Sequence, residues 1–130
     1  VRDLSGLEYF SKVKKLTIYT STPTTLNLTG MDSLEEIIST GSTIEVIQGN
    51  APRLKKIILR NSHRVKKINV VNSSNIEQIT IEEDSNIANH IECIAVPANR
   101  VNTVKQNINL GNSPAKTTAY RSKVQSTPCN

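Results

Sequence analysis

The sequence is poor in aromatic residues. Its 130 residues include no Trp, one Phe and three Tyr. Compact globular cores usually draw much of their volume from aromatic side chains, so this composition fits a conventional globule badly. The apolar residues are mainly Ile, Leu and Val, interspersed with Asn, Ser and Thr. That mixture is typical of short strands joined by tight turns.

Long apolar runs and clustered cysteines are also lacking. No run approaches the roughly 18 apolar residues of a membrane-spanning helix, which predicts that no segment crosses a membrane. The two cysteines, Cys93 and Cys129, lie far apart in the sequence and form no metal-binding motif. They permit one disulfide that would hold the C-terminal segment against the last repeats, or two free thiols. The spacing alone leaves both alternatives open.

An excess of positive charge exists, but only in the C-terminal segment. Residues 1–97 contain eleven Lys and Arg and eleven Asp and Glu, so most of the chain is neutral. The net charge of +5 comes from basic residues after Glu92, namely Arg100, Lys105, Lys116, Arg121 and Lys123. A neutral body argues against a phosphate-binding face. We therefore expect no nucleic-acid partner and interpret the basic segment as solvated.

A ten- or eleven-residue unit fills most of the chain. Its pattern is an aliphatic residue, two polar residues, an aliphatic residue, one variable residue and a further aliphatic residue, as in LKKIIL at residues 54–59. Small polar turn-forming residues follow. Seven units in phase begin at Val13, Pro23, Leu34, Ile44, Leu54, Val65 and Ile76. Each unit predicts a short strand with one buried face, and stacked units can bury the faces that a single unit cannot.

The repeat resembles a known family. DLSGLEYFSKVKKLTI at residues 3–18 resembles a repeat of the bacterial internalin kind, and LNLTGMDSLEEI at 26–37 is similar to leucine-rich repeats of Bacteroides-type surface proteins. The likeness covers residues 3–96, with Ile and Val often replacing Leu and with a patchy Asn ladder. It implies a right-handed leucine-rich-repeat solenoid that is secreted or displayed on a bacterial cell. It also implies a binding scaffold without catalytic residues or cofactors.

These observations predict one fold and two regions. We expect a mainly β solenoid of short parallel strands, with turns of about 21 residues that each contain two units of ten or eleven. The solenoid is predicted to occupy residues 1–97. Residues 98–130 are predicted to hold a weak last repeat at Ile108–Leu110 and an irregular basic cap or tail.

Alternate units should share a face, which predicts two outward columns of side chains. One column is Thr17, Ile38, Ile58 and Thr80; the other is Asn27, Gln48, Asn69 and Ala95. Exposed neighbouring isoleucines on a sheet indicate a contact surface, unless a loop covers them or the inward-outward phase differs there. The predicted partner-binding residues are Thr17, Ile38, Ile58, Arg60 and Thr80.

Charged doublets occupy one position of the unit. The lysine pair 14–15, the glutamate pair 35–36 and the lysine pair 55–56 should lie in adjacent layers, where alternating signs support the register. A second set forms the one local basic cluster in the body of the sequence. An anionic partner or sulfated glycan could bind there, on Arg53, Lys55, Lys56, Arg64, Lys66 and Lys67.

The sequence thus predicts a non-enzymatic recognition module, extracellular or on a bacterial surface, that binds a protein partner. No set of residues suggests catalysis or a metal site. One alternative is a structural spacer within a larger surface protein. The other is a parallel β-helix enzyme acting on polysaccharide, which the lack of clustered carboxylates and aromatic sugar platforms disfavours.

Overall fold

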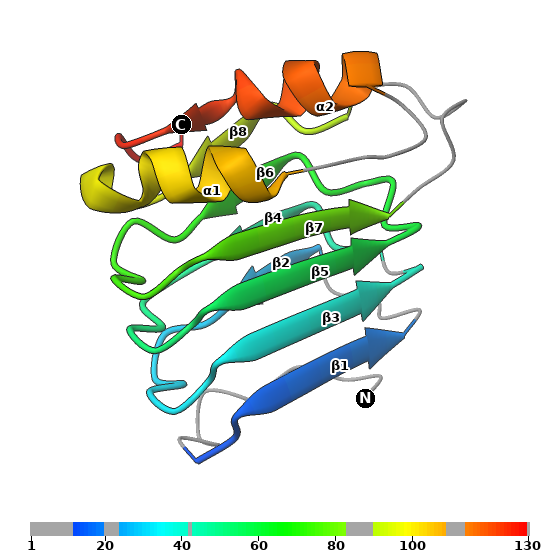
Figure 1. Cartoon of the computed structure of the whole chain (residues 1–130). Helices are drawn as coiled ribbons and strands as arrows, with labels where there is room; N and C mark the ends of the chain where they lie inside the picture. Colours follow the sequence, from blue (N-terminus) through cyan, green and yellow to red (C-terminus); the bar gives the residue numbers. More distant parts are fainter. Residues whose placement is uncertain (1–11, 20–23, 42, 83–89, 109–113, 130) are drawn as a thin grey trace.

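Two parallel β-sheets form the body of the molecule (Figure 1). The computed structural model describes residues 12–19, 24–41, 43–82, 90–108 and 114–129. Sheet A has the strand order β1-β3-β5-β7, and sheet B has the order β2-β4-β6-β8-β9. The strands of sheet A are β1 (Lys15–Tyr19), β3 (Glu36–Thr40), β5 (Lys56–Arg60) and β7 (Gln78–Glu82). Those of sheet B are β2 (Thr25–Asn27), β4 (Val46–Gln48), β6 (Lys67–Asn69), β8 (Cys93–Ala95) and β9 (Val124–Gln125).

The chain alternates between the sheets from β1 to β8, so each layer contains one strand of each sheet. In sheet A, Leu16 pairs with Ile37, Ile37 with Ile57, and Ile57 with Ile79, all in parallel. Partners are therefore 20 to 22 residues apart, which is the length of two sequence units. The predicted mainly β architecture of short parallel strands is confirmed.

The core lies between the two sheets and consists of branched aliphatic side chains. Ile37, Ile57 and Ile79 face it from sheet A, while Ile47 and Ile68 face it from sheet B, and all five are fully buried. They belong to one continuous apolar cluster. Burying each such side chain contributes about 1.5–3 kcal/mol. Side chains of nearly equal size in every layer explain why the repeat needs few aromatic residues.

Buried serines connect the layers near the ends of strands in both sheets. Ser39 takes an aliphatic position of its unit, and its hydroxyl lies 3.0 Å from the hydroxyl of Ser62. The Ser62 hydroxyl also lies 3.0 Å from the Ser39 carbonyl oxygen, to which it can donate. Ser73 repeats the arrangement by donating to the Ala51 carbonyl at 2.8 Å. These bonds let a turn lie against the apolar core without leaving the carbonyl groups unpaired.

Replacing Ser62 by Ala should lower the free energy of unfolding by about 1–2 kcal/mol, because a buried hydroxyl that bridges two layers is lost. Urea unfolding measures the change. Ser74→Ala is the control, because Ser74 is exposed and surface substitutions usually stay within about 0.5 kcal/mol. Equal stability of the two variants would contradict a bridging role for Ser62.

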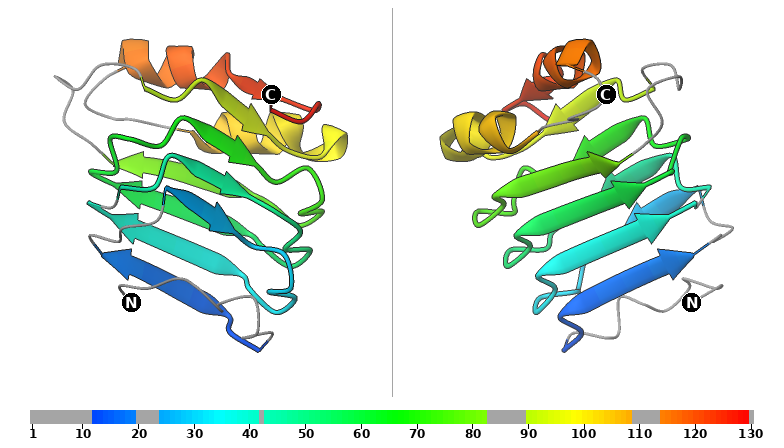
Figure 2. Two further views of the ribbon diagram at one scale, coloured as in Figure 1. Left: turned by 180° about the vertical axis from the view of Figure 1, so that it is seen from behind. Right: turned by 45° about the vertical axis from the view of Figure 1, so that its right-hand side comes forward.

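The C-terminal segment is ordered, whereas the sequence predicted an irregular one. A short 3-10 helix (Ala98–Arg100) leads into α1 (Val101–Asn107), and α2 (Pro114–Arg121) precedes β9. Both helices lie across the end of the stack, beyond β7 and β8 (Figures 1 and 2). In place of the predicted last repeat, Ile108 directly follows α1 and is buried; Asn109 and Leu110 lie outside the described residues. The cap forms because the last layer would otherwise expose its apolar edge.

Some basic residues of this segment pack into the cap, so the interpretation as solvated is wrong for Arg100, Lys116 and Arg121, whereas Lys123 is exposed. Arg100 Nε donates to the Ser74 carbonyl at 2.8 Å, and Arg121 Nε donates to the Ile108 carbonyl at 3.0 Å. Lys116 is only 5% exposed. A disulfide joins Cys93, at the start of β8, to Cys129 beyond β9. The excess positive charge is thus partly used to satisfy carbonyl groups at the end of the stack.

Candidate functional site

The outward face of sheet A carries an apolar column, which we define as Thr17, Ile38, Ile58 and Thr80. The register places these four residues side by side on β1, β3, β5 and β7, on strands about 4.8 Å apart. Each of them lies between two buried neighbours along its strand, so the predicted outward phase is correct. All four side chains are half-buried rather than fully exposed. The isoleucines therefore form a shallow apolar strip in the middle of the face.

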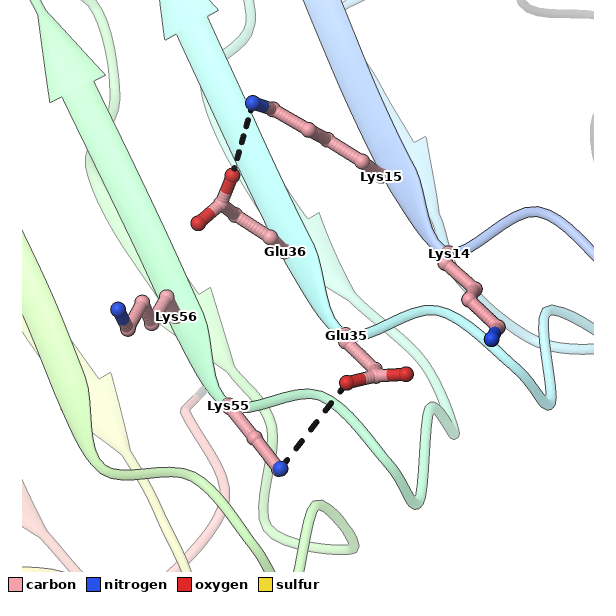
Figure 3. A pocket seen from close by; sticks show the side chains of 6 residues that line it. All are labelled: Lys14, Lys15, Glu35, Glu36, Lys55 and Lys56. Atoms are coloured by element: carbon pink, nitrogen blue, oxygen red, sulfur yellow. Dashed lines mark ion pairs between the residues drawn. The ribbon is translucent and has the colours of Figure 1, made fainter.

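A charged groove lies beside this column, where the sheet A strands begin (Figure 3). It has a volume of about 340 Å³. Lys15 Nζ lies 3.3 Å from Glu36 Oε2, and Lys55 Nζ lies 4.0 Å from Glu35 Oε1. The predicted alternation of charge between layers is therefore present. Six side chains line the groove, namely Lys14, Lys15, Glu35, Glu36, Lys55 and Lys56.

The groove has an excess of positive charge because four lysines face two glutamates. Within the described part of the chain, Lys14 and Lys56 form no ion pair with a carboxylate (Figure 3). The paired lysines contribute little to stability, since exposed ion pairs are worth about 0–1 kcal/mol. Lys14 and Lys56 are thus available for a carboxylate of a bound molecule.

The other side of the apolar column is also polar. Arg60 pairs in register with Glu82, and its Nε lies 2.5 Å from Glu82 Oε2. Arg60 was predicted to contact a partner; the structure places it at the end of β5, next to the column, with its charge neutralised. The face therefore has an apolar middle between two charged margins.

The predicted basic cluster is divided between the two sheets. Lys56 begins β5 in sheet A, whereas Lys67 begins β6 in sheet B. Lys55 pairs with Glu35, and Lys66 Nζ lies 3.8 Å from Glu45 Oε1. Two further residues, Arg53 and Arg64, are exposed in the turns before β5 and β6. The six residues therefore do not form one continuous anion-binding surface.

Sheet B carries the second predicted column, in which Asn27 pairs with Gln48, Gln48 with Asn69, and Asn69 with Ala95. Asn27 and Gln48 are exposed and Asn69 is half-buried, but Ala95 is fully buried, so the column does not reach solvent at β8. The sequence predicted this column but assigned no site to it. The structure adds an uncharged groove of about 280 Å³ beside it, lined also by turn residues. The available sequence signal was an amide side chain at the same position of three alternate units.

The described residues contain neither a candidate metal site nor a candidate membrane-spanning helix. None of their His, Cys, Asp and Glu side chains form a group of three or more that could hold a metal ion. None of their helices has the length and apolar character needed to cross a membrane.

Comparisons of the chain with protein-family models, with curated proteins and with solved structures give no match.

Proposed function

We propose that this chain is a non-enzymatic recognition module of the leucine-rich-repeat type, a right-handed solenoid that binds a protein partner outside a bacterial cell. The outward face of sheet A is the binding surface in this proposal. The observation that carries it is the adjacency of Ile38 and Ile58 in the middle of that face. Apolar side chains at the centre of a polar rim are the usual composition of a protein interface.

The charges beside the apolar column define the kind of partner. Lys14 and Lys56 favour a carboxylate, while Ile38 and Ile58 favour an apolar side chain nearby, since Lys56 and Ile58 lie two residues apart on β5. A partner surface that presents Asp or Glu next to Leu, Ile, Val or an aromatic residue would satisfy both. The described outward face of sheet A is flat and has no deep pocket, so it suits a protein surface better than a small molecule.

Changing both Ile38 and Ile58 to Lys should weaken partner binding at least about 100-fold, because we expect these two central side chains to be the hot spots of the interface, and a hot-spot residue contributes about 2 kcal/mol or more. The measurement is capture of extracellular proteins on the immobilised chain, followed by titration of the captured protein. The fold should survive, since both side chains face outward.

The matched control is Thr25→Lys with Gln125→Lys, which adds the same charge to exposed positions of sheet B. Circular dichroism and urea unfolding would confirm that both double variants are folded. Equal capture by the wild type and the Ile38→Lys/Ile58→Lys variant would refute the proposed surface. A chain that captures nothing would instead favour a structural spacer.

A further inference from the structure

The groove on sheet B is lined by uncharged hydrogen-bonding groups. Its amide column, Asn27, Gln48 and Asn69, lies on β2, β4 and β6. A second row, Thr29, Asn50 and Asn72, comes from the turns that follow these strands. None of the groove's lining residues carries a charge, in contrast to the groove on sheet A.

The second row is fixed by hydrogen bonds between its own layers. The Asn50 backbone N–H donates to Thr29 Oγ1 at 3.4 Å, and the Asn72 amide donates to Asn50 Oδ1. The first layer is held by Asn27 Oδ1, which accepts from the Thr29 backbone N–H at 3.1 Å. These contacts make the row a preorganised wall of the groove, so little order has to be imposed when a ligand binds.

The amide column retains the capacity to bind a ligand. Asn69 Oδ1 is buried and has no hydrogen-bond partner among the described residues, which is unfavourable for an acceptor. The Asn69 side chain as a whole is only half-buried, so rotation of its amide can present the oxygen to the groove. Gln48, in the adjacent layer, is exposed and has both a donor and an acceptor.

We propose that this groove binds a neutral polyhydroxylated chain, an uncharged glycan that runs along the stack across β2, β4 and β6. Amide groups both donate and accept, as sugar hydroxyl groups do. The absence of charged lining residues gives no advantage to a sulfated, phosphorylated or carboxylated ligand. Val71, which also lines the groove, offers an apolar contact for the C–H face of a sugar ring.

The spacing between layers favours β-1,4-linked over α-1,4-linked neutral glycans. Amides of the column recur about every 4.8 Å, and pyranose units of an extended β-1,4-linked chain repeat at a similar interval. Successive sugar units can therefore meet successive amides. A curved α-1,4-linked chain does not keep this alignment. The volume of about 280 Å³ lies just below the usual range for ligand pockets, which fits a short stretch of sugar held in an open groove.

The test is an NMR titration of the whole ¹⁵N-labelled chain with cellohexaose, with maltohexaose as the α-1,4-linked comparison. Cellohexaose should cause saturable shifts of the Asn27, Gln48 and Asn69 side-chain amides and leave the sheet A amides unchanged. Maltohexaose should bind at least fivefold more weakly. Absence of saturable shifts with cellohexaose, or equal binding of the two sugars, would overturn the proposal. So would binding of an uncharged Gly-Ser peptide but not of cellohexaose.

Gln48→Ala should weaken cellohexaose binding at least fivefold. The matched control is Gln125→Ala, which removes the same exposed side chain from the same sheet outside the groove and should change binding less than twofold. Circular dichroism shows whether each variant is folded. Unchanged binding by folded Gln48→Ala would refute the assignment of the amide column.

Discussion

Replacement of Gly49 by Ala is expected to destabilise the protein by about 2–5 kcal/mol. Gly49 has a φ of +123°, and a Cβ atom there would lie 2.7 Å from the backbone nitrogens of Leu28 and Thr29. Placing a side chain at this positive φ costs about 1–2 kcal/mol. The overpacking of the added Cβ atom against the backbone adds about 1–3 kcal/mol. The Leu28 N–H donates to the Gln48 carbonyl at 2.8 Å, so relief of the clash requires two layers to separate where they are bonded.

Gly41→Ala is the matched control for this prediction. Gly41 also has a positive φ, +61°, but a Cβ atom added there meets nothing within 4 Å among the described contacts. Only the backbone strain remains, and we expect a loss of about 1–2 kcal/mol. Urea unfolding of both variants separates the two causes. Similar losses for Gly41→Ala and Gly49→Ala would mean that the close approach of the layers is relieved at little cost.

Removal of the disulfide by Cys93→Ala with Cys129→Ala should lower the free energy of unfolding by about 2–4 kcal/mol. The bond joins residues 36 positions apart, and a cross-link over such a loop restricts the unfolded chain. It also anchors the segment that contains β9, a strand of two residues paired with β8. Urea unfolding with and without a reductant measures the total effect, and the double variant should not respond to the reductant.

Hydrogen exchange shows where the disulfide acts. Amides of β9 and α2 should exchange faster in the double variant, because these elements lose their covalent attachment, whereas β3 and β5 should change only through global unfolding. Uniformly faster exchange would indicate that the disulfide supports the whole stack. Unaltered stability and exchange would indicate that noncovalent packing alone holds the cap.

The parallel strands and most of both outward columns could be predicted because the repeat varies in length by only one residue through its first seven units. Counting alternate units was enough to place Ile38 beside Ile58 and Gln48 beside Asn69. The same regularity explains why the basic cluster was misjudged. Lys56 and Lys67 are neighbours in consecutive units, and consecutive units belong to opposite sheets. Strands of consecutive units therefore lie in different sheets, and strands that pair with each other come from units two apart in the sequence.

The cap and the amide groove could not be predicted in this way. Val101, Val104 and Ile108 have helical spacing, but eight residues contain too few turns to distinguish a helix from a degenerate repeat. Tyr120, fully buried, belongs to a helix that forms against the end of the stack. The groove depends on Thr29, Asn50 and Asn72, whose position beside the amide column is set by turn geometry. Periodicity indicates which way a strand side chain faces, but not where a turn side chain lies.

The pairing of both sheets restricts how a chain of this design can change length during evolution. Duplication or deletion of two units, 20 to 22 residues, would return the following strand to its own sheet and extend or shorten both faces by one layer. Loss of a single unit would move every later strand to the opposite sheet. Each outward column would then change partway along the stack, from isoleucines to amides or from amides to isoleucines. Extra residues in a connection are tolerated, as the 26-residue interval between the partners Ile68 and Ile94 shows. Length variants should therefore differ by whole layers or by loop insertions, and single-unit changes should be rare.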